Sequence, residues 1–268
     1  SSDLVCIAMD VNTGAILAMV TTDGYDLNNP YELSAKDKKK IKSTSKKKQA
    51  EAESAALSNM WRNKAVADTY MPGSVFKMCV ASAALEENLV NEKTSFTCTG
   101  SISVEGETIH CSNISGHGTQ SFVEAISNSC NPAFIQIGQM LGAGKFRQYY
   151  QGLGFSDKTG IDLPGEAEDS FWKEGKMGGV DLAVASFGQN FTITPIQMIT
   201  ACAAVSNGGY VVQPHVVSKI TDSKGNVIKT VDKKVKRQVI SDDTSKKMNE
   251  YLEYNTERQG AAAGYISG

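Results

Sequence analysis

Apolar and polar positions alternate like strands near both ends of the chain. The stretches VCIAM and ILAMV flank a turn of Asn-Thr-Gly, so residues 4–20 predict a β-hairpin. Residues 216–231 predict another hairpin that turns at Lys-Gly-Asn, and residues 95–111 predict a third that turns at VEGE. These segments account for the expected strands.

Longer apolar runs with helical spacing occupy the middle of the chain. We expect a short helix over 119–128 with Thr119 as its N-cap, and a helix over 131–142 with Pro132 in its first turn. The other expected helices cover residues 74–87, 180–188, 194–209 and 242–257. Strands towards both ends with helices between them predict an α+β domain.

Length, composition and charge narrow the class of protein. The 268 residues, 41% of them apolar, suffice for one large domain or two small ones with a real core. A net charge of −2 argues against a general nucleic-acid binder. No apolar run approaches the ~18 residues that a membrane span needs, and no signal peptide is visible. Because the chain opens in a strand-like pattern, we expect it to be a piece whose anchor lies upstream.

Residues 34–60 form a lysine-rich segment within the predicted domain. Eight lysines lie between Lys36 and Lys48. The first interpretation is a solvated, partly helical surface insertion; the alternative is a contact with an anionic polymer or with lipid headgroups.

The sequence YMPGSVFK places a serine and a lysine at the start of an apolar helix. Pro72 and Gly73 end the preceding segment, and Ser74 and Lys77 share a helix face because they are three residues apart. A serine beside an amine is a candidate activated nucleophile. The alternative is that Ser74 caps the helix while Lys77 is a solvated cation.

A second short motif follows between two predicted helices. Ser129 and Asn131 form Ser-x-Asn, which is weak alone but gains weight downstream of Ser-x-x-Lys. Longer stretches then extend the pattern almost from end to end: MDVNTGAILAMV, YMPGSVFK, GHGTQSFVEAISNSCNPAF, GLGFSDKTGIDLPGE, ASFGQNFTITPIQMI and AVSNGGYVVQPHVV.

With these motifs the chain resembles the transpeptidase domain of a class B penicillin-binding protein. The resemblance implies an antiparallel sheet flanked by helices, a mostly helical subdomain and an active site between them. It implies a serine D,D-transpeptidase that needs no cofactor, cross-links peptidoglycan stem peptides ending in D-Ala-D-Ala, and is acylated by β-lactams. Ser74 would be the nucleophile, Lys77 its base, Ser129 a proton relay to the leaving amine, and Asn131 the holder of the substrate amide.

The same resemblance implies where the parent protein lies, which partners it has and which alternative functions remain. The parent would lie on the outer face of the bacterial cytoplasmic membrane with cell-wall synthesis partners and no nucleic acid. A β-lactam sensor or a catalytically silent scaffold of the same fold is the alternative, and a serine β-lactamase is a further one.

The third motif of this family, Lys-Thr-Gly, is expected outside the sequence. Residues 158–160 read Lys-Thr-Gly, but Pro164 and Gly165 stop a strand at once, so this stretch predicts a structural turn. Glu166 and Glu168 belong to that turn rather than to a deacylating base. The true motif should follow residues 260–268, so that the transpeptidase domain, residues 1–268, would be truncated just before it and lack its C-terminal strands.

Two thiols and an imidazole surround the second motif. Cys111, His117 and Cys130 allow three interpretations. They are unpaired small residues, a Cys111–Cys130 disulfide (with Cys98 as another partner), or a structural zinc site with Asp68 as the fourth ligand.

Overall fold

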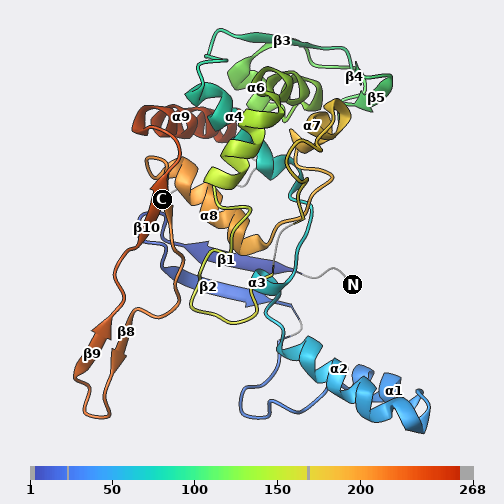
Figure 1. The fold of residues 1–268 in the computed structure, drawn as a ribbon, viewed down its shortest axis with the longest axis vertical. Helices are drawn as coiled ribbons and strands as arrows, with labels where there is room; N and C mark the ends of the chain where they lie inside the picture. The colour runs from blue at the N-terminus through green and yellow to red at the C-terminus, as the bar shows by residue number, and fades with distance from the viewer. Residues whose placement is uncertain (1–3, 23, 168–169, 260–268) are drawn as a thin grey trace.

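A layer of helices covers one face of an N-terminal β-hairpin (Figure 1). The computed structural model describes residues 4–22, 24–167 and 170–259. The expected hairpin is confirmed: β1 (Val5–Met9) pairs antiparallel with β2 (Ile16–Thr21). Its inner side chains pack against α3 (Lys64–Ala67) and α8 (Pro195–Ser206), and they bury a small cluster that includes Val66 and Ile196.

The main core lies among four longer helices above this hairpin. Helix α4 (Lys77–Glu86) contacts α6 (Asn131–Gly152), α8 and α9 (Asp242–Gln259). Most residues of α4 are buried, which explains why its sequence is apolar or small on nearly every side rather than along one stripe. Helix α6 extends ten residues beyond the predicted 131–142. It is kinked at Gly142, whose φ of 73° is not helical, so that two helical segments meet at this residue.

The strands between α4 and α6 differ from the predicted single hairpin over 95–111. Only β4 (Ser101–Val104) and β5 (Glu107–His110) form that hairpin. Strand β3 (Ser95–Cys98) instead pairs with β6 (Gly118–Ser121). Gly100 makes the change of direction possible, because its φ is +96° and a Cβ there would lie 2.0 Å from the Ile114 carbonyl oxygen.

Helix α5 (Phe122–Ser127) begins later than the sequence predicts. Ser121 caps it, and the side chain of Glu124 accepts a hydrogen bond from the Ser121 backbone in return, forming a capping box. The predicted cap, Thr119, lies in β6 opposite Thr97. The error arises because Thr119 and Ser121 are both good caps, and only the strand pairing distinguishes them.

Two segments project from the body in Figure 1. One holds α1 (Ala35–Lys42), the short 3₁₀ turn η1 (Lys46–Lys48) and α2 (Gln49–Trp61), none of whose residues is buried. The other is the predicted hairpin of β8 (Lys219–Thr221) and β9 (Val227–Thr230).

The remaining elements complete an α+β fold, as expected. Strand β7 (Tyr210–Val212) pairs antiparallel with β10 (Val235–Gln238), and α7 (Gly179–Ala185) packs on α6. Among the described residues, no helix combines the length and the apolar character needed to cross a bilayer.

Candidate active site

Ser74 lies in a single 3₁₀ turn, η2 (Gly73–Phe76), that leads directly into α4. Residues i and i+3 are eclipsed in a 3₁₀ turn, so the side chains of Ser74 and Lys77 emerge on the same face. The interpretation of Ser74 as a helix cap is wrong, because Pro72 is at the N-cap of η2, Phe76 is at that of α4, and no side chain caps either. Ser74 itself is exposed.

The backbone before Ser74 is fixed against the segment that follows α7. The Gly73 N–H donates to the Gly188 carbonyl at 2.8 Å, and Tyr70 and Ile193 exchange hydrogen bonds of 2.9 and 3.0 Å. A Cβ on Gly188 would lie 2.0 Å from the Gly73 carbonyl oxygen, so the two chains approach as closely as only glycine permits. The position of the Ser74 turn therefore depends on the sequence around Gly188.

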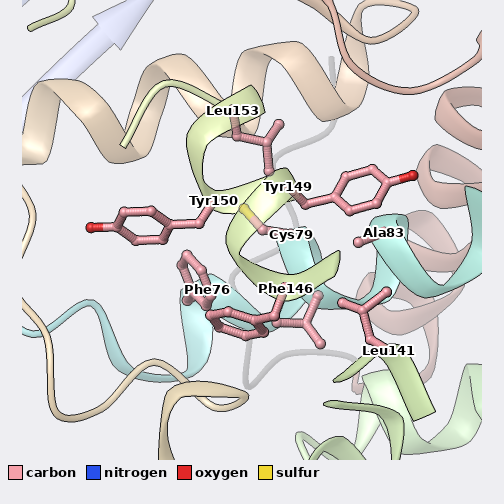
Figure 2. Close-up of a pocket in the computed structure, with 9 residues that line it drawn as sticks. Phe76, Cys79, Ala83, Leu141, Phe146, Tyr149, Tyr150 and Leu153 are labelled. Carbon is pink, nitrogen blue, oxygen red and sulfur yellow. The ribbon is translucent and has the colours of Figure 1, made fainter. Parts of the chain in front are cut away.

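Phe76 anchors the other side of the turn in the core. Its ring lies 4.9 Å from that of Phe191 and 5.3 Å from that of Phe155, measured between ring centroids. Figure 2 shows Phe76 with Phe146 and Tyr150 around a small void. With a volume of about 10 Å³ and an apolar lining, this void is a packing defect of the core rather than a ligand site.

Lys77 is buried, with only 4% of its surface exposed. Its Nζ donates to the Ser129 carbonyl oxygen at 2.6 Å, to Asn131 Oδ1 at 2.7 Å and to Ser129 Oγ at 3.0 Å. The interpretation of Lys77 as a solvated cation is thus wrong. Burial lowers the pKa of Lys77 to about 8, although the nearby Cys130 and Cys111 thiols act in the opposite direction.

Ser129 is held by the way in which α5 ends. Its N–H donates to the Ile126 carbonyl, and the N–H of Cys130 donates to the Ala125 carbonyl, which together form a Schellman motif. The residue after the C-cap of such a motif is left-handed and is usually glycine; here it is Ser129, with φ 47°. This conformation turns the Ser129 carbonyl and hydroxyl towards Lys77.

Asn131 begins α6 two residues later. Its Oδ1 accepts from Lys77, while its Nδ2 donates to the His110 carbonyl at 3.2 Å. Cys130 lies between the two motif residues and is fully buried. The structure therefore gathers the predicted residues Lys77, Ser129 and Asn131 into one hydrogen-bonded group next to the Ser74 turn.

Cys130 belongs to a cluster of three thiols and one imidazole behind this group. Its ligand atoms, which all lie within 4.8 Å of one another, come from Cys98, Cys111, His117 and Cys130. Cys111 Sγ lies 3.6 Å from His117 Nδ1. No disulfide joins Cys111 to Cys130 or to Cys98, since all of these thiols are free.

The prediction of Asp68 as the fourth member of this cluster is wrong. The Asp68 carboxylate forms an ion pair with Arg62, and the fourth place belongs to Cys98. Cys98 ends β3 and Cys111 follows β5, so they lie at the two bases of the β4–β5 hairpin. The pairing of β3 with β6, which the sequence pattern missed, brings Cys98 to this place.

The environments of the thiols differ. Burial raises the pKa of the Cys130 thiol to about 12. Burial also opposes ionisation of Cys111, but N–H groups of Asn113 and Asn131 donate to its sulfur, and the net effect lowers its pKa. Cys111 is therefore the thiol that ionises more readily.

The Lys-Thr-Gly sequence at 158–160 forms a turn around Glu166. The Glu166 carboxylate accepts from the N–H of Thr159 at 2.6 Å and from the N–H of Gly160 at 3.0 Å. These contacts agree with the expected structural turn. Glu168 and residues 260–268, after which the third motif is expected, lie outside the described residues.

Comparison with known proteins assigns the chain to a family. Residues 4–268 match the family model described as the penicillin binding protein transpeptidase domain. The chain therefore belongs to the penicillin-binding protein transpeptidase family, as its motifs suggested.

Relatives of this family cover nearly all of the chain. It is 34% identical to stage V sporulation protein D of Bacillus subtilis over 99% of its length and 38% of the relative's. It is 27% identical to the peptidoglycan D,D-transpeptidase PbpA of Mycobacterium tuberculosis over 96% of its length and 52% of the relative's. The chain thus spans about half or less of these two curated relatives.

Solved structures of the family share its fold. An imipenem acyl-enzyme complex of penicillin-binding protein A from M. tuberculosis superposes with a TM-score of 0.80 and 25% identity, over 98% of this chain and 59% of that one. A D,D-transpeptidase domain from Eggerthella lenta superposes with the same TM-score at 24% identity, over 98% of this chain and 63% of that one.

Proposed function

We propose that this chain is the acyl-transfer part of a serine D,D-transpeptidase that cross-links peptidoglycan stem peptides and is acylated by β-lactams. The observation that carries the proposal is the buried Lys77, whose Nζ makes three hydrogen bonds to Ser129 and Asn131 one 3₁₀ turn from Ser74. Relatives named as peptidoglycan D,D-transpeptidases, and one solved as an imipenem acyl-enzyme, support it.

In the proposed reaction Lys77 takes the proton of the Ser74 hydroxyl. Lysine can accept a proton only as the neutral amine, and the pKa of about 8 that burial gives Lys77 makes this form accessible near neutral pH. Ser74 Oγ then bonds to the carbonyl carbon of the penultimate D-alanine, and its backbone N–H at the start of the helix is a natural donor to the oxyanion. The peptide C–N bond breaks, and the terminal D-alanine leaves after its amine receives a proton.

Ser129 and Asn131 have separate parts in this scheme. The Ser129 hydroxyl, 3.0 Å from Lys77 Nζ, relays the proton from Lys77 to the leaving amine. Asn131 Nδ2 uses one hydrogen on the His110 carbonyl and keeps a second for the carbonyl of the substrate amide. The amine of a second stem peptide then attacks the ester and releases Ser74.

Intact mass after incubation with a penicillin tests the proposal. We expect one lasting adduct on the wild-type protein and none on Ser74→Ala, measured for this chain and for a longer form of its parent. Drug consumption without a lasting adduct would support a β-lactamase instead. Folded protein that forms no adduct in either form would support the silent scaffold, and a lasting adduct without peptide cross-linking would support the sensor.

We also propose that the cluster of Cys98, Cys111, His117 and Cys130 holds a structural zinc ion. Three thiolates and one imidazole are a common closed ligand set, and tetrahedral Zn–S bonds of about 2.3 Å place sulfurs about 3.8 Å apart. The cluster, with its ligand atoms within 4.8 Å of one another, needs only small side-chain rotations to reach that geometry. A set of four protein ligands leaves no open position, so the ion would position the second motif rather than react.

Metal analysis of protein purified without chelator tests the zinc site. We expect about one zinc per chain, retained in Cys6→Ser because Cys6 is an exposed thiol on β1 and lost in Cys98→Ser. Cys98 is the suitable change because it lies outside the Ser129–Asn131 motif. Less than about a tenth of an equivalent of zinc in the wild type would exclude the metal.

We further propose that the parent protein acts at the outer face of the cytoplasmic membrane together with other proteins of wall synthesis. The family and the sporulation and peptidoglycan names of its relatives support this location. Labelling of intact cells with a fluorescent penicillin that does not enter the cytoplasm tests it; label confined to lysed cells would contradict it.

A further inference from the structure

The segment from Ser34 to Lys48 carries an extreme local charge. It holds eight lysines and one acid, Asp37, which gives it a formal charge of +7. Because the whole chain has a net charge of −2, the remaining residues together carry −9. We call residues 34–61 the lysine arm.

The positive charges of the lysine arm are free to bind. All eight lysines are exposed. Of these eight lysines, only Lys38 has an ion-pair partner among the described residues, Glu32, so the other seven ammonium groups form no ion pair there. Helices α1 and α2 pack on each other, and Figure 1 shows them standing away from the body. The interaction of Trp61 with Pro30 and Tyr31 at the base fixes the arm to the chain that leads into it.

The distribution of the lysines around α1 indicates the shape of the partner. At about 100° per residue, the five lysines of α1 spread over an arc of about 200° of the helix circumference, and Asp37 and Ile41 lie on the remaining side. The other three follow at the tip, in η1. A flat bilayer can contact only one side of such a helix, and α1 has no apolar face to insert, since its larger apolar residue, Ile41, is half-buried in the arm. A linear polymer can bend around this arc and reach lysines that a plane cannot contact together.

The residue types indicate the chemistry of the partner. The charged segment contains lysine and no arginine, so it offers point charges rather than the planar fork that binds single carboxylates or phosphates in two contacts. It also contains no aromatic residue on which a nucleobase could stack. We propose that the lysine arm binds a linear, base-free polyanion of phosphodiester repeats, a function distinct from acyl transfer at Ser74.

Binding of fluorescent poly(glycerol phosphate), followed by anisotropy against salt concentration, tests the proposal. The test variant is the triple change K46Q/K47Q/K48Q at the tip. The control is K219Q/K224Q/K229Q, which removes the same charge from lysines that are also exposed, on the projecting β8–β9 hairpin. Since neither set is buried, both variants should fold, which circular dichroism checks.

We expect the arm variant to lose at least about tenfold in affinity at about 0.1 M salt, and its slope of log K against log salt to fall by about 2. The control should bind like the wild type. Equal losses in both variants would overturn the proposal in favour of general electrostatic attraction. Tighter binding to phosphatidylglycerol vesicles or to single-stranded DNA than to the polymer would overturn it in favour of a membrane or a nucleic acid.

Discussion

Ser129 adopts a backbone conformation in which glycine would be more stable. It occupies the left-handed position of the Schellman motif with φ 47°, and its hydroxyl lies 3.0 Å from Lys77 Nζ. A left-handed conformation costs a residue with a Cβ about 1–2 kcal/mol. Serine at position 129 therefore makes the fold less stable than glycine would, but it places a hydroxyl beside Lys77, as is typical of functional positions.

Replacing Ser129 by glycine and by alanine separates these two effects. Both changes remove the hydroxyl, and we expect both to slow acylation by penicillin about 100-fold. Only Ser129→Gly relieves the backbone, so it should unfold with a free energy about 1 kcal/mol higher than that of Ser129→Ala. Acylation rates from intact mass and urea denaturation measure the two quantities; equal stabilities would contradict the assignment of strain.

The lowered pKa of Lys77 predicts the pH dependence of acylation. The neutral amine is the proposed base, and burial brings the pKa of Lys77 to about 8. The second-order rate constant should therefore rise about tenfold per pH unit below this pKa and level off above it. Stopped-flow measurement of the acylation rate constant between about pH 6 and pH 9 tests this pH dependence. A rate that is constant over this range would show that Lys77 is not the titrating base.

At the scale of elements, the contact between Gly188 and Gly73 positions the nucleophile turn. A Cβ at Gly188 would lie 2.0 Å from a backbone oxygen, which has no flexible end to move away. We expect Gly188→Ala to lower the free energy of unfolding by more than about 3 kcal/mol and to slow acylation, because η2 must shift.

Gly225→Ala provides the matched control for this change. Gly225 also has a positive φ, +85°, but nothing lies within 4 Å of its Cβ position. Gly225→Ala should lower the free energy of unfolding by only about 1 kcal/mol and leave the acylation rate unchanged. Urea denaturation and penicillin acylation compare the two variants; similar losses would mean that the backbone angle, rather than the close approach, limits Gly188.

The sequence predicts elements well where local signals suffice. The turn signals at residues 12–14 and 224–226 locate two hairpins, and Pro132 locates the start of α6. The sequence pattern fails for β3 and β6 because the residues that pair, such as Ser95 with Ser121 and Cys98 with Gly118, lie on opposite sides of an inserted hairpin. Strand pairing at that distance leaves no local pattern, so Cys98 could not be chosen over Asp68.

In the candidate site, too, the local motifs could be predicted from the sequence, whereas the contacts between distant segments could not. The Ser-x-x-Lys and Ser-x-Asn motifs are visible in the sequence because each is confined to a few residues. Their association depends on the burial of Lys77 and on the left-handed Ser129, which arise from packing of α4 on α6 and from the end of α5. The role of Gly188 is likewise invisible without the fold.

At the scale of the whole molecule, the lysine arm is separable from the body. None of the residues in α1, η1 or α2 is buried, so the arm adds no side chain to the main core. Replacing residues 35–59 by a short Gly/Ser linker should change the unfolding midpoint by less than about 2 °C and leave penicillin acylation intact. Differential scanning calorimetry measures the midpoint; a large fall would show that the arm supports the core.

The lysine arm also makes the molecule a strong electric dipole. Residues 34–48 of the projecting arm carry a formal +7, and the rest of the chain, which includes Glu51 and Glu53 of α2, carries −9. Near a negatively charged boundary the positive segment is attracted and the negative remainder is repelled, so the molecule experiences a torque that turns the arm towards the boundary. The arm therefore turns towards such a boundary before any contact forms.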